Sequence, residues 1–243
     1  MLFSERNLFP RFPAFLQPAV CQNLMLYTLQ NLTPSRVVET VKELDPADLK
    51  AQGITAIITD LDNTLVPWQH YEIMPGVIEW LAKLEVAGIK ICIASNTIHT
   101  ERLKQLAETM GIPFVDRVQK PRTGGFRRAM KLMGSNAGNT AVFGDQLFTD
   151  VLAGNRLNLH TILLRPPLSK EEFVSTQMVR YVENGVIRKL RERGQWPAAA
   201  AVEAALDAMP DPRTPEARRR STLAIAAVLG LAVILIIRAR RKS

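Results

Sequence analysis

The chain has 243 residues and a net charge of +8, and its residues are 47% apolar and 22% charged. This composition excludes disorder over the whole chain and is ordinary for a globular domain with one sizeable core. The basic charge does not indicate nucleic-acid binding, because residues 211–243 alone hold eight Lys or Arg against two acidic residues, leaving +2 for the rest. Cys21 and Cys92 are the only cysteines, which argues against a disulfide framework and favours a reducing compartment.

Residues 1–52 predict a helical lead-in that packs on the domain that follows. Three prolines among the first 18 residues exclude a long helix there. Thr33 and Pro34 have the form of an N-cap followed by proline at the first helical position, so they predict a helix that runs to about Leu44. Asp45-Pro46 repeats this signal for a short helix. The first residues contain no long apolar run before a small-residue cleavage site, so no signal peptide is expected.

Residues 53–168 alternate short apolar runs with helical patterns, which predicts an α/β fold. The core is expected to be a Rossmann-like parallel sheet with right-handed crossovers and helices on both faces. Strands are expected over residues 55–59, 89–94, 113–116, 140–143 and 159–164, and helices over residues 76–86, 99–110, 122–133 and 147–156. The strands show little polar alternation, as strands buried on both faces do.

The part of the chain beyond the core is divided by composition into four segments. Residues 169–196 predict a basic amphipathic helix, which either lies on anionic lipid or packs on the domain with a solvated basic face. Residues 197–220 are rich in Ala and Pro and predict a linker. Residues 221–237 carry no charge and predict a single C-terminal transmembrane helix rather than a buried core helix, and the basic tail 238–243 follows them. We therefore expect a cytoplasmic domain tethered to a membrane by its tail.

Two acidic residues, Asp60 and Asp62, follow the first core strand directly. They fall at the carboxyl edge of a central strand, where open α/β sheets bind their ligands. Two carboxylates leaving a buried strand would repel each other at neutral pH, so the arrangement suggests a metal ion that offsets their charge. The alternative is a turn rich in Asp and Asn without further function.

Polar clusters also follow the other core strands or precede a helix. Ser95 and Asn96 follow the second strand, Asp145 and Asp150 follow the fourth, and Lys120 precedes the helix expected over residues 122–133. Because the strands are expected to be parallel, these clusters converge on one edge of the sheet. Because all four polar clusters converge at one edge, a turn rich in Asp and Asn without further function is a less favourable explanation of Asp60 and Asp62.

The four clusters together resemble the motifs of the haloacid dehalogenase (HAD) superfamily of phosphotransferases. Those motifs are DxDxT, a Ser or Thr after the second strand, a Lys, and GDxxxxD. The segments TDLDNTLVPW, PGVIEWL, KPRTGGFRRAMKLMG and GDQLFTDVLAGNRL are more specifically similar to the YqeG-like class IIIA phosphatases. That subfamily includes mitochondrial and plastid phosphatidylglycerophosphate phosphatases. The resemblance covers roughly residues 14–195.

The resemblance implies catalytic roles for Asp60, Asp62 and Lys120. Asp60 is expected to attack phosphorus and form an aspartyl-phosphate, while Asp62 protonates the leaving group and then activates water. Lys120 is expected to neutralise the phosphoryl charge. Ser95 and the backbone N–H of Asn96 are expected to hold phosphate oxygens.

The resemblance also implies a Mg²⁺ site and a further substrate-binding residue, Thr64. Mg²⁺ would be held by Asp60, Asp62 through its backbone carbonyl, and Asp145, and Asp150 would brace the metal shell. Oxygen ligands of this kind suit a hard cation.

The spacing of the motifs leaves no room for more than a minimal cap. Asp60 to Ser95 holds a turn and a helix, and Ser95 to Lys120 holds a helix and a short strand. An open site suits a phosphate on a large or membrane-held substrate better than a small metabolite. The resemblance therefore predicts a phosphatidylglycerophosphate phosphatase whose partners are a phosphorylated lipid headgroup and a membrane. The alternatives are a phosphatase of a soluble sugar, nucleotide or phosphoprotein, and a tail-anchored binding protein without activity.

Overall fold

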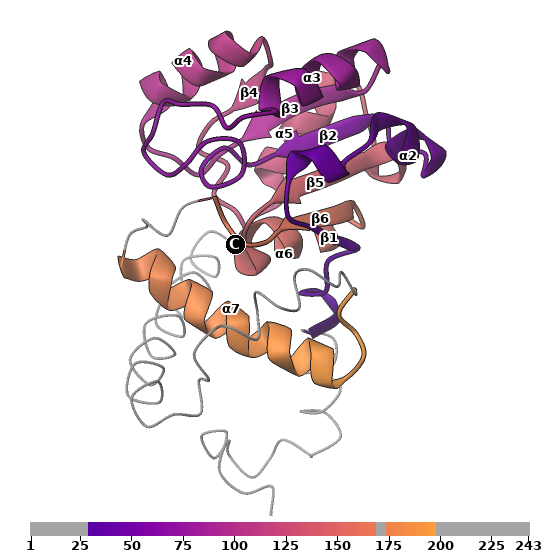
Figure 1. Ribbon diagram of the computed structural model, residues 1–243, viewed down its shortest axis with the longest axis vertical. Helices are drawn as coiled ribbons and strands as arrows, with labels where there is room; N and C mark the ends of the chain where they lie inside the picture. Colours follow the sequence, from indigo (N-terminus) through magenta and orange to yellow (C-terminus); the bar gives the residue numbers. More distant parts are fainter. Residues whose placement is uncertain (1–28, 169–173, 198–243) are drawn as a thin grey trace, which may run out of the picture.

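The computed structural model describes residues 29–168 and 174–197, as Figure 1 shows. The linker, the membrane span and the basic tail expected beyond residue 197 lie outside the described residues, as do residues 1–28. Within the two described ranges, no helix combines the length and the hydropathy that crossing a bilayer requires.

The described residues form a six-stranded sheet in the order β1-β6-β5-β2-β3-β4, and every neighbouring pair is parallel. The strands are β1 (Arg36–Val38), β2 (Ala56–Thr59), β3 (Lys90–Ala94), β4 (Phe114–Val115), β5 (Thr140–Gly144) and β6 (His160–Leu164). Thr59 of β2 is in register with Ile93 on one side and with Phe143 on the other. The strand order reverses between β2 and β5, and open α/β sheets bind ligands at such a switch point. The predicted parallel α/β core is confirmed.

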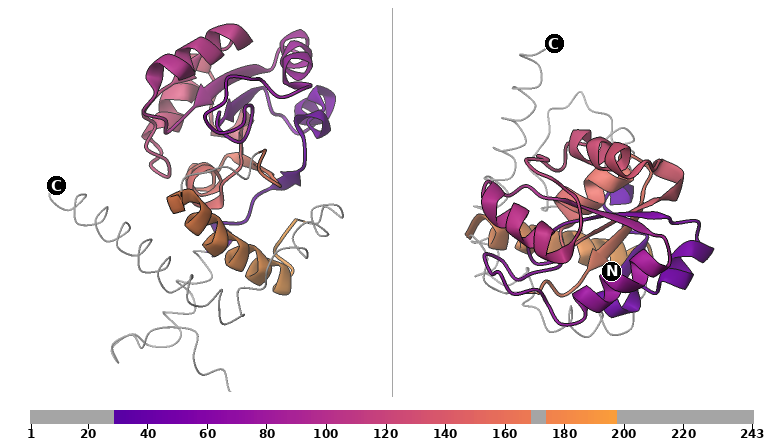
Figure 2. Two further views of the ribbon diagram at one scale, coloured as in Figure 1. Left: turned by 60° about the vertical axis from the view of Figure 1, so that its left-hand side comes forward. Right: turned by 90° about the horizontal axis from the view of Figure 1, so that it is seen from above.

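Helices cover both faces of the sheet (Figure 2). They are α2 (Pro46–Ala51), α3 (Val77–Val86), α4 (Thr100–Met110), α5 (Gly124–Met133), α6 (Leu152–Asn155) and α7 (Val174–Glu192), with short helices η1 (Val41–Glu43), η2 (Ala137–Asn139) and the π-helical turn η3 (Leu147–Val151). Helices α2, α3 and α4 share one apolar cluster with the sheet, and α5 and α6 share another. Successive residues of β5 divide between the clusters, since Phe143 packs edge-on against Trp80 at 5.9 Å while Val142 faces α5 and α6. The strands are thus buried on both sides, which explains their uniform apolar character.

The prediction of a helix from Thr33-Pro34 to Leu44 is wrong. Residues Arg36–Val38 instead form β1, an edge strand that pairs in parallel with β6. Val37 and Val38 are buried on this strand. Pairing with β6 supplies the backbone hydrogen bonds that a helix would have made, and β-branched residues suit a pleated surface. Pairing with a strand more than a hundred residues away therefore determines the conformation of this segment, and the local capping signal does not.

Helix α7 packs on the domain at the β1–β6 end of the sheet (Figure 1). Its buried residues Ile187 and Leu190 form a third apolar cluster with Val37 of β1 and Leu163 of β6. Of the two uses that the sequence left open for this segment, the structure shows packing on the domain.

The segments that could carry a cap hold only the expected elements. Residues 61–119, all of which the structure describes, form α3, β3, α4, β4 and the loops between them. No cap domain is therefore inserted in this part of the chain.

Candidate active site

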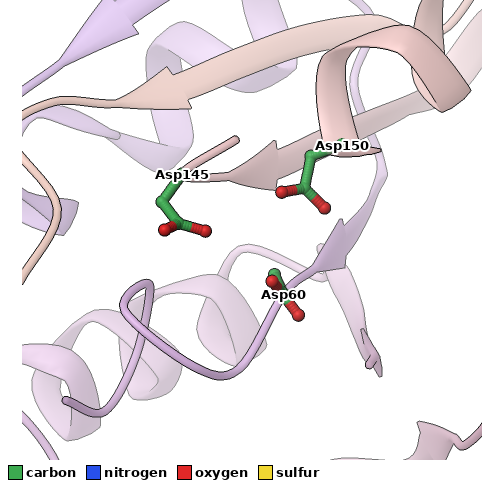
Figure 3. A group of neighbouring side chains, drawn as sticks. All are labelled: Asp60, Asp145 and Asp150. Atoms are coloured by element: carbon green, nitrogen blue, oxygen red, sulfur yellow. The ribbon is translucent and has the colours of Figure 1, made fainter. Parts of the chain in front are cut away.

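Three carboxylates, two at the ends of neighbouring strands and one in the turn that follows, meet at the switch point of the sheet, as Figure 3 shows. Asp60 follows β2, Asp145 follows β5, and Asp150 lies in the π-helical turn η3. One carboxylate oxygen of each lies within 4.8 Å of the others. Asp145 and Asp150 are buried, and the side chain of Asp60 is 11% exposed. The strand ends thus bring these acidic residues together as the sequence predicted.

Lys120 lies between two of these carboxylates. Its Nζ is 2.8 Å from Asp60 Oδ1 and 2.7 Å from Asp150 Oδ1, and its side chain is 2% exposed. Asn96 holds the backbone of Lys120 from both sides: the Lys120 N–H donates to Asn96 Oδ1 at 2.8 Å, and Asn96 Nδ2 donates to the Lys120 carbonyl at 3.2 Å. The side chain of Asn96 therefore contacts the loop that holds Lys120, residues 116–123, which we call the lysine loop.

The electrostatics of this group favour a bound cation. Burial raises the pKa of Asp60 from 3.8 to about 8, with Asp150 and Asp145 adding to the effect and Lys120 opposing it. Burial also raises the pKa of Asp150. For Lys120, burial disfavours the charged form, but Asp150 and Asp60 outweigh it and raise the pKa above its usual value. The three carboxylates exceed the positive charge that Lys120 supplies, and buried acidic residues in excess are stabilised by a metal ion. Asp60, Asp145 and Asp150 could hold one, because carboxylate oxygens suit a hard divalent cation.

Asp62 is not a member of this group of three, and it pairs with a residue that the sequence did not single out. Arg102 of α4 places Nη1 2.8 Å from Asp62 Oδ1 and donates from Nε to the His70 carbonyl at 3.0 Å. The guanidinium also stacks over the ring of Tyr71 at 5.7 Å. Burial raises the pKa of Asp62, and Arg102 opposes that effect. A carboxyl with a raised pKa suits a proton-donating role.

Thr64 and Ser95 lie at the same edge of the sheet. Thr64 is buried and its Oγ1 is 3.4 Å from Asp145 Oδ1. Ser95 follows β3, the neighbour of β2, and its Oγ accepts from the Thr97 N–H at 3.1 Å. Both residues are predicted to contact substrate, and the structure places Thr64 directly beside a carboxylate of the group.

Two features of the site could not be found from motifs. Arg180 of α7 pairs with Asp145 through both its carboxylate and its backbone carbonyl. The sequence pattern indicates only a basic helix here, although Glu183, three residues after Arg180, is the signal of an ion-pairing helix face. Gly144 is the second feature, because a Cβ there would lie 2.3 Å from Cγ of Asp150. The close approach of η3 to β5 therefore needs glycine at this position.

Comparison with known proteins places these residues in a family. Residues 28–158 match the family described as haloacid dehalogenase-like hydrolase. The Bacillus subtilis (strain 168) protein named "Probable phosphatase YqeG" is 40% identical over 165 residues, which cover 67% of this chain and 95% of that protein. Phosphatidylglycerophosphate phosphatase 1, chloroplastic/mitochondrial, of Arabidopsis thaliana is 28% identical over 177 residues, which cover 69% of this chain and 51% of that protein. The chain thus matches about half the length of the Arabidopsis relative.

A solved structure of a HAD superfamily (subfamily III A) hydrolase from Legionella pneumophila is also similar, with a TM-score of 0.41 and 19% identity. The match covers 78% of this chain and 98% of that one.

The family match spans more than half of the chain and includes Asp60, Lys120, Asp145 and Asp150. The family predicted from the four motifs is confirmed. The chain belongs to the haloacid dehalogenase-like hydrolases, and within them to the phosphatases.

Proposed function

We propose that the protein hydrolyses a phosphate monoester through an aspartyl-phosphate on Asp60. A carboxylate oxygen of Asp60 attacks phosphorus, the bond from phosphorus to the ester oxygen breaks, and Asp62 gives its proton to the leaving alkoxide. Water then attacks the phosphorus of the aspartyl-phosphate and loses a proton to Asp62. Inorganic phosphate leaves, and the Asp60 carboxylate is restored. The observation that carries this proposal is the contact of Lys120 with both Asp60 and Asp150 at the switch point of the sheet.

Lys120 and a Mg²⁺ ion share the electrostatic part of the proposed reaction. Mg²⁺ would be held by Asp60, Asp145 and Asp150, with the backbone of Asp62, and when bound it supplies positive charge toward the phosphoryl oxygens. Lys120 is held in place by Asn96 and lies against the nucleophile, so it neutralises charge that develops on the transferred group. Ser95 and the backbone N–H of Asn96 would bind phosphate oxygens, and Thr64 would support them.

The substrate that we propose is phosphatidylglycerophosphate. The Arabidopsis relative carries the name of that activity. No cap domain is inserted within residues 61–119, an arrangement that suits a phosphate presented by a lipid headgroup at a membrane surface. Exposed arginines also lie in the lysine loop and at the start of α5, and they would attract an anionic headgroup. They are Arg117, Arg122, Arg127 and Arg128.

We further propose that residues 221–237 anchor the protein in a membrane with the catalytic domain in the cytoplasm. The stretch is uncharged and is flanked by arginines on both sides. Reporters fused at Met1 and after Ser243 would test this topology. Detection of both in the cytoplasm would rule out a single span.

The proposed function is tested by phosphate release from phosphatidylglycerophosphate in mixed micelles, with Mg²⁺ or with EDTA. Wild-type protein is compared with Asp60→Asn and with Asp48→Asn, a control at an exposed position on α2. We expect release that requires both Mg²⁺ and Asp60, and no loss in the control. If the protein hydrolyses a soluble phosphate ester in a reaction that requires Asp60 but releases no phosphate from the lipid, the proposed phosphatase activity stands and the proposed substrate is rejected.

A further inference from the structure

Helix α7 reaches the carboxylate group of the site through one side chain, Arg180. Its Nη2 pairs with Asp145 Oδ2, and its Nη1 donates to the backbone carbonyl of Asp145. Arg180 is 7% exposed and Asp145 is 0% exposed. One guanidinium therefore binds both the side chain and the main chain of Asp145, at a place where both residues are buried.

This contact is reinforced by Glu183, which lies one helical turn further along α7. Glu183 Oε2 is 2.8 Å from Nη2 of Arg165, which follows β6, and 3.6 Å from Nη1 of Arg180. The other oxygen, Oε1, accepts from the Phe148 N–H at 3.1 Å. Arg180 and Glu183 thus contact residues 145 and 148, and α7 holds both ends of the segment that leads from β5 into η3.

The network is costly as a device for stability alone. Four charged side chains, Asp145, Arg180, Glu183 and Arg165, are each less than 10% exposed. Burial raises the pKa of Glu183 and lowers the pKa of Arg165, so burial disfavours the charged form of both groups. Apolar residues of the same size often stabilise a protein as well as a buried ionic network does. A role in fixing the direction of one of its members is a better explanation.

We propose that Arg180 is a positioning residue that orients Asp145 for the metal ion, so that α7 is part of the catalytic apparatus. This inference rests on the metal site of the proposed function. The planar guanidinium fixes the rotation of the Asp145 carboxylate by holding Oδ2 and the main chain together. The other oxygen, Oδ1, lies beside the Thr64 hydroxyl at 3.4 Å and is left for the cation.

The opposite role would also follow from charge alone. A guanidinium beside Asp145 repels a cation, and if Arg180 were mainly a competitor, its removal would tighten metal binding. Positioning predicts weaker binding, because an unheld carboxylate rotates and must be ordered when the metal binds. Partners of this kind typically change metal affinity by about 10- to 100-fold. The sign of the change therefore separates the two roles.

The test is calorimetric titration of the full-length protein with Mn²⁺ as the probe for the Mg²⁺ site. The variants are Arg180→Met, Arg180→Lys and Asp145→Asn, and Arg193→Met is the matched control because Arg193 is exposed just beyond the end of α7. We expect Arg180→Met to weaken Mn²⁺ binding by about 10-fold or more. Arg180→Lys should recover only part of this loss, because an ammonium group cannot hold two oxygens with the geometry of a guanidinium. The control should bind as the wild type does.

A second readout separates positioning from damage to the fold. Thermal unfolding in EDTA shows whether each variant is folded at the titration temperature. In hydrolysis of a soluble phosphate ester, Arg180→Met should need about 10-fold more Mn²⁺ than wild type to reach its half-maximal rate, with an unchanged KM for the ester. If Arg180→Met does not fold, Arg180→Lys carries the test.

Two results would overturn the inference. The first result applies when Asp145→Asn binds Mn²⁺ weakly. In that case, positioning by Arg180 is excluded if Arg180→Met binds Mn²⁺ as tightly as wild type or more tightly. If Arg180→Met does not fold, wild-type affinity of Arg180→Lys excludes it instead. No difference between wild type and Asp145→Asn would instead reject the metal site of the proposed function, and this role with it.

Discussion

At the scale of single residues, the site combines more negative charge than its neighbours balance. Lys120 lies against Asp60 and Asp150, and Arg180 pairs with Asp145, so two cations face three carboxylates. The raised pKa of Asp60, about 8, is the consequence of this excess together with burial. Such a site costs stability in the absence of a metal ion, and the cost is a property that can be measured.

The substitution Asp60→Asn is expected to stabilise the metal-free protein at pH 8. In the folded state the Asp60 carboxyl keeps its proton to about pH 8, whereas its ordinary pKa is 3.8. Wild-type stability should therefore fall as the pH rises from about 4 to about 8, and each pKa difference of one is worth about 1.4 kcal/mol. Asparagine resembles the protonated carboxyl at every pH, so it removes this loss.

Urea unfolding in EDTA at pH 5 and pH 8 measures the effect. We expect the advantage of Asp60→Asn over wild type to be larger at pH 8, and Mg²⁺ to stabilise wild type but not the variant. Asp48→Asn, at an exposed position, is the control. A variant that is less stable than wild type at both pH values would contradict the idea that the carboxylates are in excess.

A second prediction at this scale concerns Arg102, which holds Asp62 at 2.8 Å. Without the guanidinium, Asp62 loses the ion pair that holds its side chain, so its carboxyl is less well placed to protonate the leaving group. We expect Arg102→Met to lower kcat by about 10-fold or more with little change in KM, since general acid–base groups contribute about 100-fold or more. Steady-state hydrolysis of a soluble ester measures both constants. Lys104→Met, exposed on the same helix, should match wild type, and an unchanged kcat in Arg102→Met would remove Arg102 from the reaction.

At the scale of elements, the start of α5 places the lysine loop. Gly125 packs so closely on this loop that a Cβ would lie 2.1 Å from a methyl carbon of Val118, whereas a Cβ at Gly124 meets nothing within 4 Å. Gly125→Ala should therefore destabilise the protein by about 1–3 kcal/mol through overpacking. Gly124→Ala should be neutral or stabilise it by up to about 1 kcal/mol, because alanine restricts the unfolded chain more than glycine does.

Denaturant unfolding of these two variants gives the comparison directly. Because Val118 is two residues before Lys120, Gly125→Ala should also lower activity more than its loss of stability explains. Equal stability of the two variants would mean that the loop moves freely away from α5.

The elements of the core could be predicted from sequence because each signal was local. Apolar β-branched runs, C-terminal glycines such as Gly111 and Gly134, and the alternation of strands with helices fixed the elements to within a few residues. The edge strand β1 could not be predicted in this way, because only its pairing with β6 makes residues Arg36–Val38 extended. A three-residue strand carries too short a pattern to compete with the Thr33-Pro34 capping signal.

The residues of the site likewise fall into those that the sequence predicts and those that it does not. Asp60 and Asp145 lie at the ends of neighbouring parallel strands, and Asp150 lies in the turn η3 that follows β5. Because the topology of a parallel sheet brings strand ends together, their convergence followed from the sequence. Arg102 and Arg180 come from helix surfaces, where arginine is common and usually solvated. Which arginine of a helix faces the site depends on how the helix packs on the sheet, and no local sequence pattern gives that orientation.

At the scale of the whole molecule, the lack of an inserted cap domain in residues 61–119 and the exposed arginines that follow Lys120 agree with a substrate held at a membrane. Arg122, Arg127 and Arg128 are exposed around the start of α5, next to Lys120. Each basic side chain near an anionic surface contributes about 1 kcal/mol, so three of them can raise the affinity for an anionic headgroup by about 10-fold or more. The same arginines have no comparable partner when the substrate is a small soluble ester.

Replacing Arg122, Arg127 and Arg128 together with alanine should therefore raise KM for phosphatidylglycerophosphate in vesicles by about 10-fold or more. The KM and kcat for a soluble ester should change little, and salt should raise the wild-type KM for the lipid by screening the same attraction. A control variant with alanine at Lys42, Lys50 and Lys83 removes the same charge from exposed positions elsewhere and should behave as wild type. An equal loss on both substrates would show that the arginines support the chemistry or the fold, whereas no loss on either would show that the lipid approaches the site from another direction.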